Sequence, residues 1–218
     1  MNDHGIRSTL MLLTSLVILT AWSLTGCGKP LSNPPQPPPS TRIQLSTPAL
    51  LSAENLAPGL AVIYLDKFYR KVSRMPDAAR AKTMGKQGQP ILQLNHKAGK
   101  EGLVFNSGKK KGVGMILTGY LHLRTPGEYE FQALSNDGIE CVLGGKQIFI
   151  DPDVHKDRLT PVGIVDVSAG GWYPLTIRYF QRKGTSALKF YWQPPGTNEF
   201  SIIPQEIFAH LNGGRSAQ

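Results

Sequence analysis

The chain has 218 residues, a formal net charge of +9 and only two cysteines. So few cysteines exclude a disulfide framework, and the length left after the N-terminal segments suits one domain with its own core. The positive charge is compatible with polyanionic partners. No RNP-type, zinc-finger or helix-turn-helix pattern accompanies it, however, which excludes a module that recognises specific nucleic acid.

Residues 1–26 have the composition of a secretory signal peptide. Arg7 precedes an apolar run from Leu10 to Leu24, which is shorter than the roughly 20 apolar residues of a membrane-spanning helix. The run leads into Leu24-Thr25-Gly26-Cys27, which resembles the bacterial lipobox, whose cysteine is diacylated on sulfur before the leader is cut. We predict that lipidated Cys27 is the mature N-terminus and holds the protein on a membrane. Lipoproteins without an aspartate directly after the cysteine usually resemble outer-membrane proteins, and this position holds Gly28 here. We therefore expect the protein in the cell envelope, at the outer membrane.

Residues 27–58 are predicted to be a disordered, proline-rich tether. Six prolines lie between Pro30 and Pro39, and the remaining residues up to Pro58 are mostly small or polar. Such a segment buries no core, and polyproline II extends by about 3.1 Å per residue. We therefore expect it to hold the following domain away from the bilayer.

A basic cluster follows the tether. Between Lys67 and Lys111, twelve lysines and arginines stand against two acids, Asp77 and Glu101, so this stretch carries a local charge of +10. Clustered positive charge attracts polyanions such as lipid phosphates, acidic glycans and wall polymers, although a solvated loop has the same composition. The candidate residues for a polyanion patch are Lys97, Lys100, Lys109, Lys110 and Lys111.

A series of short β-type runs fills the chain from Gly119 to Gly196. Tyr129, Phe131 and Ala133 alternate with polar residues, as in a half-buried strand. Residues 139–143 and 146–150 flank Gly-Gly and predict a tight hairpin, and two further alternating runs occupy residues 175–179 and 188–192. The pattern predicts an all-β sandwich or barrel over residues 59–211, followed by a flexible tail at 212–218. Cys141 lies in one of these runs and is expected to be a small buried hydrophobe.

The order and spacing of these motifs resemble the PA14 domain, a β-barrel or jelly-roll module. The matching segments are Gly59-Leu60, Thr118-Gly119-Tyr120-Leu121, Gly127–Phe131, Ser135-Asn136-Asp137-Gly138, Gly145-Lys146, Ala169–Tyr173, Ile177–Gln181 and Trp192–Gly196. The stretch between Tyr64 and Gly112, which holds most of the basic cluster, matches poorly. The resemblance implies a binding module that often recognises carbohydrate, and it implies no catalysis.

Sugar-binding members of this family hold calcium with two adjacent aspartates before a glycine, which are joined by a cis peptide. Here the matching residues are Asn136, Asp137 and Gly138. Calcium affinity follows ligand charge, and Asn136 removes one negative charge from the pair. Two interpretations stay open: a calcium and sugar site built on Asn136 and Asp137, or a plain turn in which Gly138 supplies a positive φ.

Aromatic rings could also form a sugar-binding surface, because ring faces stack on the C–H surfaces of pyranoses. Trp172 and Tyr191 are the candidates, and a place in the core is the alternative for each. Residues 151–157 lack the glycine and the glutamate of an EF-hand, the histidines have no zinc-ligand spacing, and the chain contains no hydrolase motif.

The sequence therefore predicts a non-catalytic, lipid-anchored envelope protein with a PA14-like domain that recognises a glycan. The alternative is a docking component of an envelope assembly, which binds a protein or a polyanion through the basic region at residues 67–111. No cofactor is certain, and calcium is the single candidate.

Overall fold

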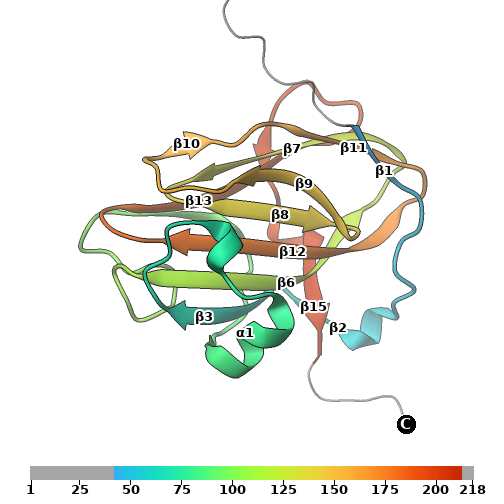
Figure 1. The fold of residues 1–218 in the computed structure, drawn as a ribbon. Helices are drawn as coiled ribbons and strands as arrows, with labels where there is room; N and C mark the ends of the chain where they lie inside the picture. Colours follow the sequence, from blue (N-terminus) through green and yellow to red (C-terminus); the bar gives the residue numbers. More distant parts are fainter. Residues whose placement is uncertain (1–41, 213–218) are drawn as a thin grey trace, which may run out of the picture. The chain divides into compact units, whose positions relative to one another are not determined.

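The computed structural model describes residues 42–212, which form two β-sheets and one short α-helix (Figure 1). The all-β prediction is confirmed. The predicted signal peptide, the lipidation site at Cys27 and nearly all of the predicted tail lie outside the described residues. No helix within residues 42–212 is long and apolar enough to cross a membrane.

Sheet A has seven strands in the order β1-β11-β7-β13-β14, with β10 beside β7 and β5 beside β13. Its strands are β1 (Arg42–Leu45), β5 (Asn95–Ala98), β7 (Gly127–Ser135), β10 (Arg158–Leu159), β11 (Gly163–Val167), β13 (Ser186–Gln193) and β14 (Ser201–Ile202). All of its pairs are antiparallel except β1 with β11.

Sheet B has eight strands in the order β2-β15-β6-β12-β8-β9, with β3 beside β6 and β4 beside β3. Its strands are β2 (Leu56–Pro58), β3 (Ala61–Asp66), β4 (Lys86–Gln87), β6 (Val113–Leu123), β8 (Ile139–Leu143), β9 (Lys146–Asp151), β12 (Gly171–Gln181) and β15 (Phe208–Leu211). The remaining elements are α1 (Ala78–Met84) and the 3-10 turns η1 (Ala53–Asn55), η2 (Val72–Arg74) and η3 (Gln205–Ile207).

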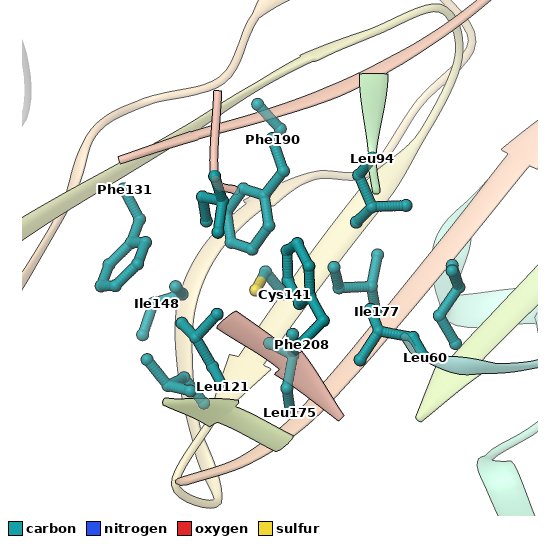
Figure 2. Close-up of a cluster of buried hydrophobic side chains, with 14 of the residues drawn as sticks. Leu60, Leu94, Leu121, Phe131, Cys141, Ile148, Leu175, Ile177, Phe190 and Phe208 are labelled. Atoms are coloured by element: carbon teal, nitrogen blue, oxygen red, sulfur yellow. The ribbon is translucent and has the colours of Figure 1, made fainter. Parts of the chain in front are cut away.

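The main core lies between the two sheets and follows the predicted alternation. In β7 the side chains of Tyr129, Phe131 and Ala133 are buried, and Cys141 lies in the core among side chains of both sheets (Figure 2). Burial raises the pKa of the Cys141 thiol well above its ordinary value, and the nearby Glu140 adds to this effect. Cys141 is therefore the inert, buried hydrophobe that the sequence predicts.

A second, smaller core lies on the outer face of sheet B, under α1 and η2. Ile116 and Phe180 point outward from β6 and β12 and pack in one cluster with Leu65 of the neighbouring β3 and with Met75 and Ala81 above the sheet. The helix begins at Asp77, whose side chain accepts a hydrogen bond from the Arg80 amide at 2.8 Å. One end of this sheet face is thus closed, although the sequence predicted no helix there.

The domain begins earlier than predicted, because residues 42–45 and 56–58 of the predicted tether are strands of the two sheets. Strand β1 pairs with β11, Ala49 bridges to Trp172, and β2 pairs with β15. Leu45 is buried in the main core. Backbone hydrogen bonds to strands that come late in the chain, together with one buried leucine, hold this segment in place.

The strand register collects five segments at one end of the sandwich. Asp66 lies opposite Val113, Ile139 lies opposite both Tyr179 and Asp151, and Ser186 lies opposite Ala98. We call this the loop end, and it appears at the left in Figure 1. It comprises residues 66–71, 97–112, 136–138, 151–158 and 182–185.

Candidate functional site

The loop end unites two sets of residues that the sequence analysis treated as rival sites. Asn136 donates a hydrogen bond from Nδ2 to Asp157 Oδ1 at 2.8 Å, and Lys97 Nζ lies 3.1 Å from Asp157 Oδ2. One carboxylate therefore joins the predicted sugar-site turn to the predicted polyanion patch. The other four lysines of that patch lie on residues 97–112 of the same end and are exposed.

The turn at Asn136, Asp137 and Gly138 has a different geometry from the one predicted. Asp137, not Gly138, has the positive φ, at 66°. Aspartate tolerates this left-handed region better than most residues. Position 138 needs glycine for space, because a Cβ there would lie 2.4 Å from Phe180 Cε1 and 2.8 Å from the Pro152 carbonyl oxygen.

The polar groups of this turn are used within the protein. Asp137 is 2% exposed, and its Oδ2 accepts a hydrogen bond from the Arg182 amide at 2.6 Å. Burial raises the pKa of the Asp137 carboxyl above its ordinary value, although that hydrogen bond opposes the rise. The Asn136 and Asp137 amides donate to the carbonyl oxygens of Ala187 and His155 at 2.9 and 3.1 Å.

These residues do not fit the calcium ion that the resemblance implies. Calcium takes about 6–8 oxygen ligands, and its affinity rises with their charge. Asp137 is the turn's single carboxylate, and it is buried against a backbone amide. In the part of the chain that the structure describes, no group of three or more acidic, histidine or cysteine side chains could hold a metal, and every peptide bond is trans.

Protein cations pair with the other acids of the loop end. Asp151 is held by Arg158 through two hydrogen bonds of 2.7 and 2.5 Å, and His155 Nε2 lies 3.1 Å from the same carboxylate. The remaining pairs are Lys71 with Asp153 at 3.5 Å, Lys110 with Glu101 at 2.8 Å, and Lys109 with Asp66.

Asp157 shows the electrostatic effect of this pairing. Burial alone would raise the pKa of its carboxyl, but the hydrogen bonds from Asn136 and Lys97 outweigh burial and lower that pKa. Asp157 therefore stays ionised while it holds both partners. The acids of the loop end are occupied by the protein itself, so little negative charge remains there for a metal.

The loop end carries a large positive excess. Twelve cations stand against six acids, a formal charge of +6. The cations are Lys67, Arg70, Lys71, Lys97, Lys100, Lys109, Lys110, Lys111, Lys156, Arg158, Arg182 and Lys183. Lys100, Lys111 and Lys183 are exposed, and none of them makes an ion pair within residues 42–212.

The predicted aromatic residues lie elsewhere. Trp172 opens β12 at the opposite end of the sandwich, where its ring stacks on His122 with centroids 4.4 Å apart and planes 12° apart. Tyr191 lies in β13 between Gln132 and Ile202 of the neighbouring strands. Both side chains are half-buried, and the structure does not bring either of them to Asn136 and Asp137.

A groove of about 580 Å³ lies on the outer face of sheet B, and no sequence pattern had predicted it. Its lining includes Thr118 and Tyr120 of β6 and Pro174 and Thr176 of β12. The Thr118-Gly119-Tyr120 segment had been noted only as a fold motif. Alternation of polar and aromatic residues along that run is the feature that could have indicated an exposed sheet face.

Comparison with known proteins identifies the fold. A family model described as PA14 domain matches residues 94–206, which is more than half of the chain. No curated protein sequence matches this chain significantly. Among solved structures, an anti-sigma factor domain-containing protein from Clostridium clariflavum superposes with a TM-score of 0.59 at 20% identity, over 74% of this chain and 50% of that one. The chain thus spans about half the length of that protein.

Two further structures match over nearly their whole length. The PA14 domain of the MpAFP antifreeze protein has a TM-score of 0.54 at 14% identity, over 75% of this chain and 96% of that one. The A domain of epithelial adhesin 9 from Candida glabrata, solved in complex with Galβ1-4GlcNAc, has a TM-score of 0.56 at 14% identity, over 74% and 93%. At these identities the likeness establishes the fold alone.

Proposed function

Since this chain belongs to the PA14 domain family, we propose that its β domain binds carbohydrate and catalyses no reaction. Adhesin domains of similar fold have been solved with Galβ1-4GlcNAc and with β-lactose, which supports the ligand class. The described residues supply no metal-binding group of acidic, histidine or cysteine side chains, so the proposal depends on what the loops themselves offer to a sugar.

The charge of the loop end is the observation that carries the ligand's chemistry. Six of the twelve cations there are balanced by acids, and the excess of +6 points outward on exposed lysines and arginines. Ammonium and guanidinium groups donate charge-assisted hydrogen bonds to phosphate and carboxylate oxygens. The glycan is therefore an anionic one, which bears phosphate or carboxylate groups, and protein cations take the place of the calcium ion that the resemblance implies.

The proposed setting is the cell envelope, where a lipid on Cys27 anchors the chain and the proline-rich residues 30–39 precede the domain. The lipobox-like Leu24–Cys27 segment supports this part of the proposal. An anchored binding domain meets its ligand in two dimensions, so modest affinity for a repetitive envelope polymer gives stable attachment through many contacts.

Docking onto an acidic envelope protein is the second candidate function, and one side chain favours it. Phe68 is 51% exposed within the cationic loop end. A Cβ added to Gly112 would lie 2.7 Å from its ring, so this ring lies against the segment that carries Lys109–Lys111. Exposed aromatic side chains are enriched at protein interfaces, and the surrounding lysines would attract an acidic partner.

A binding panel with charge-matched variants tests the proposed function. The full-length protein is titrated with neutral oligosaccharides, with the same sugars carrying uronate or phosphate groups, and with an acidic protein that bears no glycan. We expect the anionic sugars to bind. The triple variant Lys100→Ala, Lys111→Ala, Lys183→Ala, which removes the three exposed cations that make no ion pair within residues 42–212, should weaken this binding by about tenfold, if each contact contributes about 0.5 kcal/mol.

The matched control variant carries Arg124→Ala, Lys146→Ala and Lys189→Ala. It also loses three positive charges, but outside the loop end, and it should bind like the parent. Equal losses in the two triple variants would show that net charge alone matters and would contradict a site at the loop end. Binding to the acidic protein but to no glycan would favour the docking function.

A further inference from the structure

The outer face of sheet B is divided into a covered half and an open half. Where its outward residues are apolar, as at Ile116 and Phe180, α1 and η2 cover them. Farther along β6 and β12 the outward residues become polar or aromatic, and there the register pairs Thr118 with Thr176 and Tyr120 with Pro174. These four residues line the groove of about 580 Å³.

The groove runs along paired strands in the middle of the sheet. Its floor comes from β3, β6 and β12, while Lys82 of α1 and Gln87 of β4 lie toward the covered half and His210 and Leu211 of β15 complete the lining. Strands β6 and β12 are each paired on both sides. They offer no unpaired strand edge, so an extended peptide could not add itself to the sheet here.

The lining has the chemistry of a neutral sugar site. Tyr120 and Pro174 supply flat C–H-rich surface, the hydroxyls of Thr118 and Thr176 can donate and accept, and the Gln87 amide can do both. Lys82 and His210 are the basic residues of the lining, and none of the described residues that line the groove is acidic. The volume lies within the range of about 300–1,000 Å³ that is common for small-ligand sites.

The aromatic surface continues beyond the groove. Two residues before Pro174 in β12, Trp172 stacks on His122 of β6, and this pair lies on the same outward face as Tyr120. Outward side chains recur every second residue along a strand, which spaces these platforms about 6.6–6.8 Å apart. A ligand with repeated rings in one line matches such a row better than a single sugar does.

We propose that this groove is a second carbohydrate site, which takes a neutral oligosaccharide chain lying along β6 and β12. The inference rests on the proposed function in that the domain must be a carbohydrate binder. It differs from that function in place and chemistry, because the groove lies on a sheet face and carries little charge, whereas the loop end is cationic.

The test uses a length series of uncharged β-linked oligosaccharides of galactose and N-acetylglucosamine, from disaccharide to hexasaccharide. Titrations of the full-length protein are made at about 1 M salt, which shortens the Debye length to about 3 Å and suppresses binding by the cationic loop end. We expect affinity to rise with chain length. Tyr120→Ala and Thr176→Val should each weaken the longest ligand by about tenfold, whereas Tyr120→Phe, which keeps the ring, should retain binding.

Two controls keep the sites apart. Tyr191→Ala, on the other sheet, and the triple loop-end variant Lys100→Ala, Lys111→Ala, Lys183→Ala should bind the neutral series like the parent, and thermal unfolding checks that every variant is folded. Parental binding by Tyr120→Ala, or loss in the triple variant, would overturn the groove site. Binding of anionic but not neutral sugars would overturn it and leave the proposed function intact, while failure of both sugar classes would overturn both.

Discussion

Asp137 has a structural role that its position in a sugar-site motif conceals. The residue adopts a φ of 66°, which few side chains tolerate, and its carboxylate accepts the Arg182 amide across the loop end. The carboxylate thus ties the turn after β7 to the turn after β12. Burial raises the pKa of this carboxyl, so its negative charge costs the folded state free energy.

Asp137→Asn should therefore be tolerated. Asparagine keeps an acceptor oxygen, and it also tolerates the left-handed region. A carboxyl whose folded pKa lies above its unfolded pKa contributes stability that is present below the unfolded value and lost as pH rises through the folded one. At pH 7 the variant should be at least as stable as the parent, and the difference should shrink toward pH 4, measured by denaturant unfolding.

Asp137→Ala is the contrasting variant, because alanine leaves the Arg182 amide without its acceptor and disfavours the positive φ. It should destabilise the protein by about 1–3 kcal/mol at either pH. If Asp137→Asn were as damaging as Asp137→Ala, and if calcium stabilised the parent but neither variant, the carboxylate would be a metal ligand after all.

The first strands of the domain illustrate what an element gains from partners distant in sequence. Strand β1 has four residues and pairs in parallel with β11, a strand more than a hundred residues later. Its last residue, Leu45, is 4% exposed, whereas Leu50 in the following connection is 100% exposed. The same residue type thus lies in two opposite environments within a segment that the sequence predicted to be a tether.

Leucine-to-alanine variants at these two positions test the assignment of the segment. Leu45→Ala should lower the free energy of unfolding by about 2–4 kcal/mol, because it opens a cavity in the main core. Leu50→Ala should change it by less than about 0.5 kcal/mol, since this side chain is fully exposed. Chemical denaturation of the full-length variants measures both, and equal, small effects would restore the tether prediction.

Strands that carry a period-two pattern or flank a clear turn signal were predictable, and the others were not. β7, β12 and β13 coincide with alternating runs, and β8 and β9 coincide with the two runs that flank Gly144-Gly145. Helix α1 has only seven residues with one fully buried alanine, so no helical periodicity announces it. Strand β1 follows the proline-rich residues 30–39 closely in the sequence, and only its pairing with β11 shows that it belongs to the sheet.

At the scale of the whole domain, charge separates along the strands. The loop end has a formal charge of +6, whereas the connections of the opposite end carry two cations and four acids, a charge of −2. The opposite end is defined by residues 46–55, 124–128, 144–146, 166–170 and 194–200. Such a separation orients the domain toward an anionic surface or polymer before contact, an effect that weakens as salt shortens the Debye length.

The sequence located part of this surface and misjudged its extent. The predicted patch residues Lys97, Lys100 and Lys109–Lys111 all lie within residues 97–112 of the loop end. The sequence could not add Arg182 and Lys183, which reach the loop end only through the pairing of β12 with β6. Nor could the sequence show that the cations of α1 lie over the outer face of sheet B and not at the loop end. Acid–cation pairings such as Asp157 with Lys97 join loops far apart in the chain, so they too require the fold.

A calcium and salt series tests the central claim, that protein cations rather than a metal recognise an anionic glycan at the loop end. The tightest anionic oligosaccharide is titrated calorimetrically into the full-length protein, in calcium and in chelator, at low salt and at about 1 M salt. Equal affinity in calcium and chelator, with a steep loss in high salt, is the predicted result. Binding that requires calcium and survives high salt would contradict the claim.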